Sequence, residues 1–316
     1  MRIIKGINNW EGSGTPDLAV TIGNFDGVHL GHQKIMKRLA EVAQKKGLES
    51  MVITFDPHPT KVLFPDKDLK LLTTTEQKLK LIEKTGVSAV LIIPFDKEFS
   101  RMPAGDFIKD ILVRKLKVKH VIIGHNYRFG KGKTGNTQML RNYGRRYGYS
   151  LNVVRNMKIG GFTVSSTRIR QLLHWGRVCE ASTLLGRPYS IHGEVVKGAG
   201  RGGSILDTPT ANIATPQELM PREGVYAVRV RMGDRLYDGV ANIGKNPTFD
   251  GKRMSYEVHL FGYSGNLLGR ELTVYFIDRL RGEKRFSSPE ELKEQIIKDI
   301  DIAKMILKEY RVDIDP

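Results

Sequence analysis

The segment at residues 21–33, TIGNFDGVHLGHQ, gathers two histidines, an aspartate and three glycines in a short stretch of chain. His29 and His32 are close enough in sequence for both imidazoles to reach one phosphate chain. Gly31, between them, lets the backbone approach the same group because it carries no side chain. Glycine-rich turns that lead into a helix present backbone N–H groups to anions. The segment therefore predicts a phosphate-binding turn.

The sequence on either side shows which elements must position this turn. Residues 18–22 are apolar and β-branched, which predicts a buried strand. Residues 34–46 predict a helix, because apolar side chains recur there on one helical face: Ile35, Leu39, Val42 and Ala43. The turn therefore joins a strand to the N-terminus of a helix.

The rest of the first half repeats this alternation. Strands are expected at 50–55, 87–95, 119–124 and 149–154, and helices at 75–86, 103–116 and 136–148. Such a pattern predicts a parallel sheet with helices on both faces and ligands at the carboxyl ends of its strands. Short runs separated by glycine and asparagine turns follow residue 186 and predict an antiparallel barrel. A terminal helix is expected to begin after Ser288. The predicted domains are 1–186 and 187–316.

Charge is distributed unevenly between these two halves. Residues 1–186 hold 31 Lys and Arg against 15 Asp and Glu, whereas residues 187–316 hold 20 against 19. The basic half should attract anions, either nucleotides or nucleic acid. We do not expect nucleic acid as a partner, since no aromatic-basic pattern of an RNA-binding sheet is present. A solvated basic face without a specific ligand is the remaining alternative.

The sequence also indicates a compartment. No apolar run approaches the ~20 residues that span a bilayer, and the N-terminal residues lack the features of a signal peptide. The single cysteine, Cys179, excludes an internal disulfide and suits a reducing environment. The cytoplasm is therefore expected, with no membrane partner.

Two further stretches bear on phosphate binding. The GKT at 132–134 does not fit a P-loop, because Tyr127 stands where the motif needs glycine. Residues 164–170, VSSTRIR, start a predicted helix with hydroxyl and guanidinium groups in one turn. They either form an ordinary helix start or bind phosphates left free by the first turn. The two histidines of that turn have no nearby cysteine or acidic partner to complete a zinc site.

The first half resembles the FMN adenylyltransferase module of bacterial bifunctional riboflavin kinase/FAD synthetases. The resemblance rests on GNFDGVHLGH at 23–32, GHNYRFG at 124–130, SSTRIR at 165–170 and TFDPHP at 54–59. It implies a Rossmann-like nucleotidyltransferase domain in which His29 and His32 are catalytic. The implied ATP and phosphate ligands are Gly23, Phe25, Asp26, Gly27, Gly31, Ser166, Thr167 and Arg170. The implied flavin contacts are Phe55, Pro57, Pro59, Asn126 and Phe129.

The second half resembles the riboflavin kinase module of the same proteins. It carries PTAN at 209–212, GVYAV at 224–228, GVANIGKNPTF at 239–249 and YEVHLF at 256–261. The resemblance implies that Glu257 is the catalytic base and that Thr210 and Asn212 bind Mg²⁺ and nucleotide. Glu257 as a plain outward strand residue is the alternative. The chain departs from the family where Asp207 and Thr208 replace a glycine and an apolar residue, although Arg201 or Mg²⁺ would offset that carboxylate.

The resemblance covers nearly the whole chain and implies two ATP-dependent reactions with Mg²⁺. Riboflavin is phosphorylated to FMN, and FMN is then adenylylated to FAD with release of pyrophosphate. An FAD synthetase with an impaired kinase module is the nearest alternative, because of Asp207 and Thr208. A cytidylyltransferase on the same scaffold is disfavoured by the kinase-like second half. The expected partners are the small molecules ATP, riboflavin and FMN, and the oligomeric state is left open.

Overall fold

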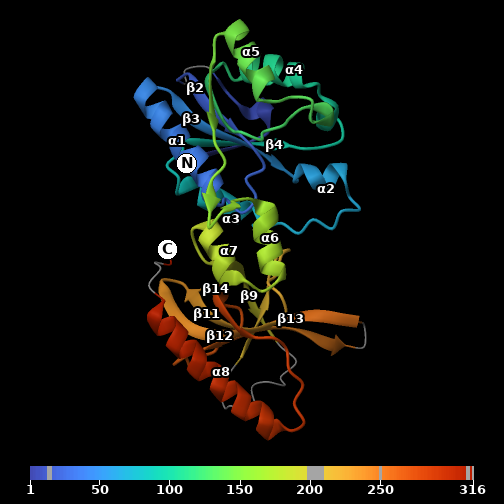
Figure 1. Ribbon diagram of the computed structural model, residues 1–316, viewed down its shortest axis with the longest axis vertical. Coiled ribbons are helices and arrows are strands. Elements are labelled where there is room, and N and C mark those ends of the chain that lie inside the picture. Colours follow the sequence, from blue (N-terminus) through green and yellow to red (C-terminus); the bar gives the residue numbers. More distant parts are fainter. Residues whose placement is uncertain (13–15, 198–209, 249–250, 311–313, 315–316) are drawn as a thin grey trace. The chain divides into compact units, whose positions relative to one another are not determined.

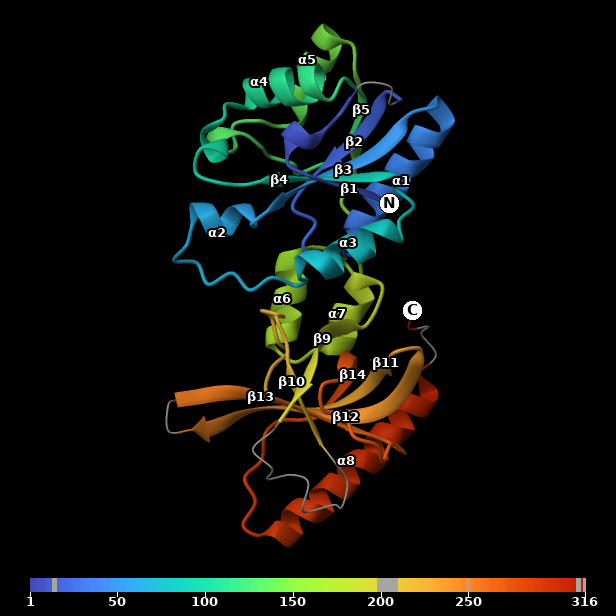
Figure 2. The same cartoon turned by 180° about the vertical axis from the view of Figure 1, so that it is seen from behind.

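The computed structural model describes the chain apart from residues 13–15, 198–209, 249–250, 311–313 and 315–316. The chain folds into two compact units, Met1–Ser165 and Ser166–Pro316. Figures 1 and 2 show both units from opposite sides. This division groups residues 166–186 with the second unit. The predicted domain boundary after residue 186 stays a prediction.

The first unit is built on a parallel six-stranded sheet, which confirms the fold expected for this half. Its strands are β1 (Arg2–Lys5), β2 (Leu18–Ile22), β3 (Glu49–Asp56), β4 (Ala89–Pro94), β5 (Val118–Gly124) and β6 (Ser150–Val154). Their order in the sheet is β1-β4-β3-β2-β5-β6. The edge strand β1 was not predicted, because Ile4 is its one buried residue and the strand shows no alternation.

Helices cover both faces of this sheet, as Figures 1 and 2 show. The α-helices are α1 (Leu30–Lys46), α2 (Pro59–Leu63), α3 (Thr75–Glu83), α4 (Ala104–Asp106) and α5 (Thr137–Tyr147). A π-helix, η3 (Phe107–Lys115), continues α4, and short 3-10 turns lie at η1 (Ile7–Asn9), η2 (Phe99–Arg101) and η4 (Lys131–Lys133). One apolar cluster joins α1 and α3 to the sheet, and another joins η3 and α5 to it. A small hairpin, β7 (Lys158–Ile159) and β8 (Phe162–Thr163), follows β6.

The strand order places the predicted site at the centre of the sheet. Strand β2 lies between β3 and β5, so the chain progresses in opposite directions on its two sides. In parallel sheets ligands bind beyond the carboxyl ends of the strands at such a reversal. The loop that follows β2 is the glycine-rich turn, and it leads directly into α1.

The second unit is a closed antiparallel barrel followed by a terminal helix, as predicted, and two further helices precede the barrel in this unit. Its helices are α6 (Ser166–His174), α7 (Val178–Leu185) and α8 (Pro289–Glu309). Its strands are β9 (Tyr189–Val196), β10 (Ala211–Ala214), β11 (Gly224–Met232), β12 (Arg235–Thr248), β13 (Gly251–Leu260) and β14 (Glu271–Arg281), in the barrel order β10-β13-β12-β11-β14-β9. Gly193 lets β9 and β10 approach closely, since a Cβ there would lie 2.1 Å from the carbonyl oxygen of Ala214.

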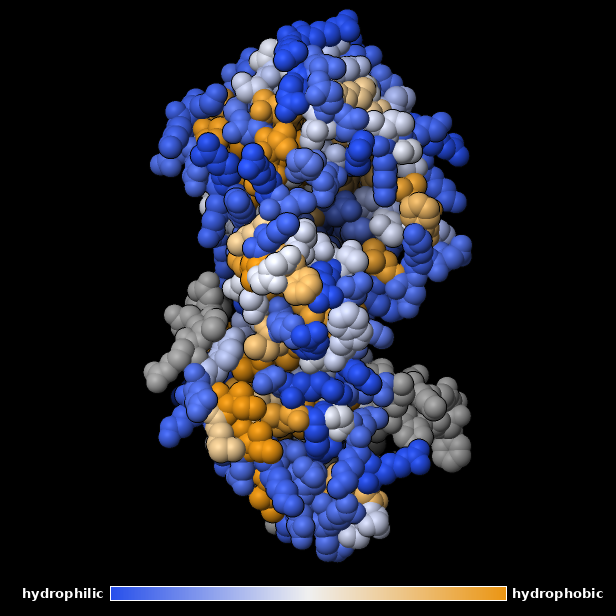
Figure 3. All heavy atoms as spheres, in the orientation of Figure 1, coloured by the Kyte–Doolittle hydropathy of each residue, from blue (hydrophilic) through white to orange (hydrophobic). Residues whose placement is uncertain are grey.

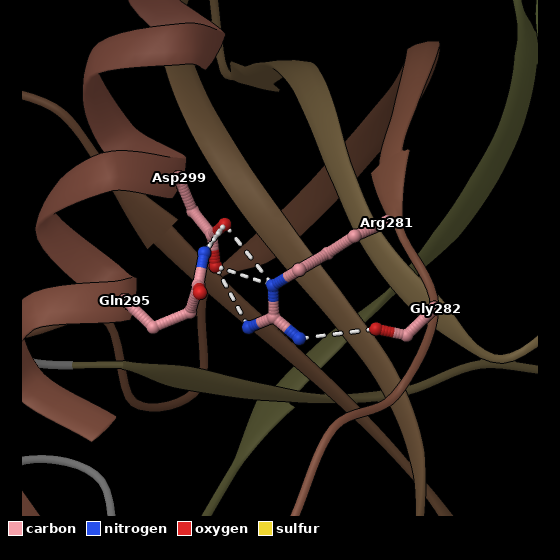
Figure 4. A network of polar contacts seen from close by, with 4 residues as sticks. All are labelled: Arg281, Gly282, Gln295 and Asp299. Atoms are coloured by element: carbon pink, nitrogen blue, oxygen red, sulfur yellow. Dashed lines mark hydrogen bonds and ion pairs between the residues drawn. The ribbon is translucent and has the colours of Figure 1, made fainter. Parts of the chain in front are cut away.

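Helix α8 is held to the barrel by apolar packing and by one buried ion pair. Ser288 caps its N-terminus by accepting a hydrogen bond from the Glu291 N–H, as the sequence predicted. The Asp299 carboxylate, 5% exposed, accepts three hydrogen bonds of 2.8 to 3.0 Å from the Arg281 guanidinium. Gln295 donates to the same carboxylate, and Arg281 also donates to the Gly282 carbonyl (Figure 4).

The surfaces of the two units differ in character. Hydrophilic side chains cover most of the visible face of the first unit, whereas apolar side chains gather beside α8 on the second (Figure 3). Helix α8 itself exposes Ile297, Ile302 and Met305. Among the described residues, no helix is both long and apolar enough to cross a membrane.

Candidate functional site

The two histidines of the glycine-rich turn are held together at the start of α1. His29 is the N-cap residue, and its Nδ1 accepts a hydrogen bond of 3.3 Å from the His32 N–H. Their rings stack with centroids 3.6 Å apart. Since Nδ1 of His29 accepts, its ring proton is on Nε2, which makes that atom a donor. The first-turn N–H groups of α1 add further donors at the same end.

His32 is a neutral group in this arrangement. Burial, and next to it the neighbouring His29, hold its pKa well below the usual 6.5. Its Nδ1 is buried and has no hydrogen-bond partner among the described residues. The sequence predicted that both imidazoles reach one phosphate chain. A neutral imidazole can do so as a hydrogen-bonding group, and it gains a proton more readily once an anion lies beside it.

The backbone of the turn is strained in a way that the sequence did not predict. Phe25 and Val28 have φ angles of 50° and 39°, which lie in the region that favours glycine. The Phe25 ring packs edge-on against His32 and occupies the space where a Cβ of Gly23 would be. Strain of this kind persists where surrounding contacts enforce it, and it clusters at functional loops. The Phe25 ring therefore packs against His32, and Gly23 leaves room for that ring because it carries no side chain.

Asp26 is hydrogen-bonded to the segment before α3. Its buried carboxylate accepts hydrogen bonds from the Leu72 N–H at 3.0 and 3.1 Å and from the Thr73 N–H at 3.3 Å. The Thr73 hydroxyl donates to it as well and accepts from the Gly27 N–H. These contacts tie the turn to the segment before α3. They favour a supporting role for Asp26 over the direct phosphate contact that the sequence predicted.

Two of the five predicted flavin residues belong to one aromatic cluster near the carboxyl ends of β3 and β5. Phe55, at the end of β3, packs with its centroid 5.7 Å from that of Phe95 and 6.1 Å from that of Phe99. Phe99 contacts Phe107, which in turn contacts Phe129. The structure thus joins two predicted residues, Phe55 and Phe129, through rings that the motifs did not single out. Phe129 is 8% exposed, so it lies beneath the site surface.

The remaining predicted flavin residues lie in the adjoining loops. Pro57 follows Asp56 through a cis peptide bond, and Pro59 is the first residue of α2. Asn126 lies in the turn after β5 and is exposed, with its Oδ1 2.9 Å from Nδ1 of His125. All three therefore flank the same carboxyl edge of the sheet as the histidine pair.

An open cavity of about 530 Å³ lies along the first turns of α1. Leu30, Val154 and Met157 supply apolar walls, and Lys34 and Lys37 supply positive charge, whereas Arg38 is paired with the Glu41 carboxylate at 3.0 Å. It begins at the residue after His29. Its size and lining suit a ligand that combines an apolar ring with anionic groups.

Three predicted phosphate ligands belong to the second unit. Ser166, Thr167 and Arg170 lie in the first two turns of α6, which confirms the predicted helix start. The Arg168 guanidinium lies over the Trp175 ring, at 5.4 Å from its centroid. Phosphate binding by this segment stays a prediction.

In the barrel, strand register brings two predicted residues together. Asn212 on β10 lies opposite Glu257 on β13. The Ser255 hydroxyl lies between their side chains, 3.0 Å from Oε1 of Glu257 and 3.4 Å from Oδ1 of Asn212. Ser255 was not predicted from the sequence. It could have been found from its position two residues before Glu257, because residues two apart in a strand have their side chains on the same face.

Thr210 directly precedes β10 and is half-buried. It is two residues before Asn212, which lies on β10. The substitutions at Asp207 and Thr208, together with Arg201, lie outside the described residues. Hydroxyl and amide oxygens are hard donors of the kind that Mg²⁺ takes alongside water and substrate phosphates.

Comparisons with known proteins find matches for both halves of the chain. The family model of FAD synthetase matches residues 13–168, and that of riboflavin kinase matches residues 185–307. The bifunctional riboflavin kinase/FMN adenylyltransferase of Escherichia coli K12 is 39% identical over 300 residues, covering 95% of this chain and 96% of that protein. The protein of the same name from Pseudomonas fluorescens is 36% identical and covers 97% of this chain and 98% of its own length.

A solved structure has the same fold. The crystal structure described as a macrolide-efflux protein from Streptococcus pneumoniae superimposes with a TM-score of 0.88 at 30% identity, covering 96% of this chain and 99% of that one. The two family models, the full-length relatives and the folds of the two units lead to one conclusion. This chain belongs to the bifunctional riboflavin kinase/FMN adenylyltransferase family.

Proposed function

We propose that this chain makes FMN from riboflavin in its barrel and FAD from FMN at the carboxyl edge of its parallel sheet. The observation that carries the second half of this proposal is the stacked pair of His29 and His32 at the N-terminus of α1. The pair lies on the same edge as the aromatic cluster that contains Phe55 and Phe129. A site for two phosphate-bearing ligands, one of them with a large flat ring, needs both features.

In adenylyl transfer, a phosphate oxygen of FMN attacks the α-phosphorus of ATP while the bond from that phosphorus to the bridging oxygen breaks. Pyrophosphate leaves with the electron pair, so no covalent enzyme intermediate is needed. Two anions must approach each other, and fixed donors reduce that repulsion most where water is excluded. Nε2 of His29 and the first-turn N–H groups of α1 serve as such donors. The cavity along α1 is proposed to take the adenosine side of ATP.

In the kinase half, the ribityl 5′-hydroxyl oxygen attacks the γ-phosphorus of ATP, and ADP leaves. The Glu257 carboxylate takes the hydroxyl proton, and Ser255 holds that carboxylate by a hydrogen bond of 3.0 Å. We propose Thr210 and Asn212 as the protein ligands of Mg²⁺ in this half. The metal, when bound, neutralises charge on the phosphates.

In the described part of the chain, no three His, Cys, Asp or Glu side chains cluster as a metal cage would require. This suits a magnesium ion held by few protein ligands and mainly by substrate phosphates. The single cysteine suits the reducing cytoplasm, which is the proposed site of both reactions.

The experiment that tests the proposal is a time course with riboflavin, ATP and Mg²⁺, followed by separation of the flavins. FMN is expected first and FAD after it. Supplying FMN in place of riboflavin should give FAD without a lag. Folded protein that forms no FAD from FMN would overturn the adenylyltransferase assignment. Failure to form FMN from riboflavin, with FAD synthesis intact, would support the alternative of an impaired kinase module.

A further inference from the structure

Lys78, on α3, is a buried cation that neither reaction scheme uses. It is 8% exposed, and its Nζ lies 3.4 Å from the Thr54 hydroxyl oxygen and 3.5 Å from the Phe55 carbonyl oxygen. Both distances are long for an N–H···O hydrogen bond. Asp56 and Asp26 are the charged groups that act on it, and both favour its charged form.

The contacts of Lys78 connect the end of β3 with the glycine-rich turn. The Thr54 hydroxyl, which accepts from Lys78, donates to the Asn24 carbonyl of the glycine-rich turn at 3.3 Å. Phe55, whose carbonyl is the second acceptor, lies near the end of β3, and its own ring belongs to the aromatic cluster. The ammonium therefore holds the carboxyl end of β3 and, through one hydroxyl, the backbone of the turn before His29.

The stability of the fold does not explain why a charged side chain occupies this position. An ammonium loses its hydration when it is buried, and two long contacts recover little of that loss. Burial is the main cause that lowers the Lys78 pKa, while Asp56 and Asp26 oppose it. A methionine would fill much the same space without a charge. The charge is therefore maintained against a cost in stability.

We propose that Lys78 is a positioning residue for adenylyl transfer. Its ammonium keeps the turn before His29 and the end of β3, which carries Phe55, in a fixed relation, so that the donors of the turn and the aromatic cluster face the two anionic substrates together. This inference rests on the proposed adenylyltransferase function of the first unit.

The test compares Lys78→Met with Lys78→Arg in the full-length chain. The methionine variant should fold with a first unit at least as stable as the parent. Its kcat for FAD formation from FMN should fall by about 10- to 100-fold, the size expected for loops displaced by a fraction of an ångström to about 1 Å. KM should change less, and FMN formation from riboflavin should be unchanged. Lys78→Arg keeps the charge and should restore most of the rate.

Lys80→Met is the matched control, because Lys80 is an exposed residue of the same helix that pairs with Glu76. It should leave both activities unchanged. A pH profile gives a second measurement. The parent should lose adenylyl transfer at alkaline pH as Lys78 deprotonates below the usual 10.5, whereas Lys78→Arg should keep its rate there. Over the same range the parent should gain stability, because its unfolded state then binds more protons than its folded state.

Three results would overturn the inference. Lys78→Met at the parental rate would show that the charge is not needed. A destabilised first unit that Lys78→Arg does not restore would assign the residue a purely structural role. Equal loss of both activities would exclude a specific effect on adenylyl transfer. Failure of the parent itself to form FAD from FMN would instead refute the proposed function.

Discussion

Asp26→Asn tests whether this carboxylate supports the glycine-rich turn or binds phosphate. The substitution keeps the shape of the side chain but replaces one acceptor oxygen with an NH₂ donor. Both carboxylate oxygens accept from the Leu72 N–H, at 3.0 and 3.1 Å, and one also accepts from the Thr73 N–H. In either amide orientation, a charge-assisted acceptor is lost and a donor faces the Leu72 N–H.

The expected cost follows from these contacts. A hydrogen bond to a charged group contributes about 1.5–3 kcal/mol, and a buried group left without its partner costs about 1–3 kcal/mol. Asparagine is uncharged, so the variant does not have to bury a carboxylate charge, and this offsets part of the lost stability. We therefore expect the first unit to lose about 3 kcal/mol of unfolding free energy. That is a large share of the about 5–15 kcal/mol that stabilises a typical protein.

Urea unfolding followed by tryptophan fluorescence measures this change. The chain has two tryptophans: Trp10, 5% exposed in the first unit, and Trp175 in the second. A Trp175→Phe background leaves Trp10 as the reporter of the first unit. Asp66→Asn is the control, because Asp66 is an exposed aspartate of the same unit. An Asp26→Asn variant with parental stability but weaker ATP binding would refute the supporting role.

Three further predictions concern other parts of the structure. The pKa of His32 in the folded protein lies below 6.5, so the unfolded chain binds a proton there more readily than the folded one. The first unit should therefore lose stability as the pH falls below 6.5, by up to about 1.4 kcal/mol per pH unit. In acid titrations, His32→Gln should remove this dependence. Asp299→Ala leaves the Arg281 guanidinium without its partner, and should destabilise the second unit by about 3 kcal/mol in calorimetry. If Asp299→Ala destabilises the second unit less than the exposed control Asp301→Ala does, the described packing of α8 on the barrel is contradicted. Ser255→Ala removes the hydrogen bond to Glu257 and should lower the kinase rate about 2- to 10-fold; an unchanged rate would show that this contact does not orient the base.

Much of the fold could be predicted because its elements are strongly periodic. Buried parallel strands are continuous apolar runs, and α1 repeats its apolar residues on one face, so both are visible in local sequence. Met36 proved to be fully buried on α1, while Ile35, named in the prediction, is partly buried. Strand β1 and the two-residue strands β7 and β8 were missed, because such short segments carry no period.

The site was harder to predict, since its details depend on contacts between distant residues. The motif identified His29 and His32, but the stacking of their rings follows from the cap geometry of α1. Asp26 looks like a ligand in the sequence, and only its partners 46 and 47 residues away show what its carboxylate does. Lys78 was not singled out at all, because nothing in a local pattern separates a buried lysine from an exposed one.

The claim that two separate sites act in sequence is tested most directly by complementation. Glu257→Gln removes the proposed kinase base and should form FAD from FMN but no FMN from riboflavin. His29→Ala should form FMN normally and lower FAD formation by about 10²-fold or more. Mixed together with riboflavin, ATP and Mg²⁺, the two variants should again produce FAD, because FMN released by one is a substrate for the other. A mixture that accumulates riboflavin or FMN without FAD, while each variant remains folded, would contradict the account.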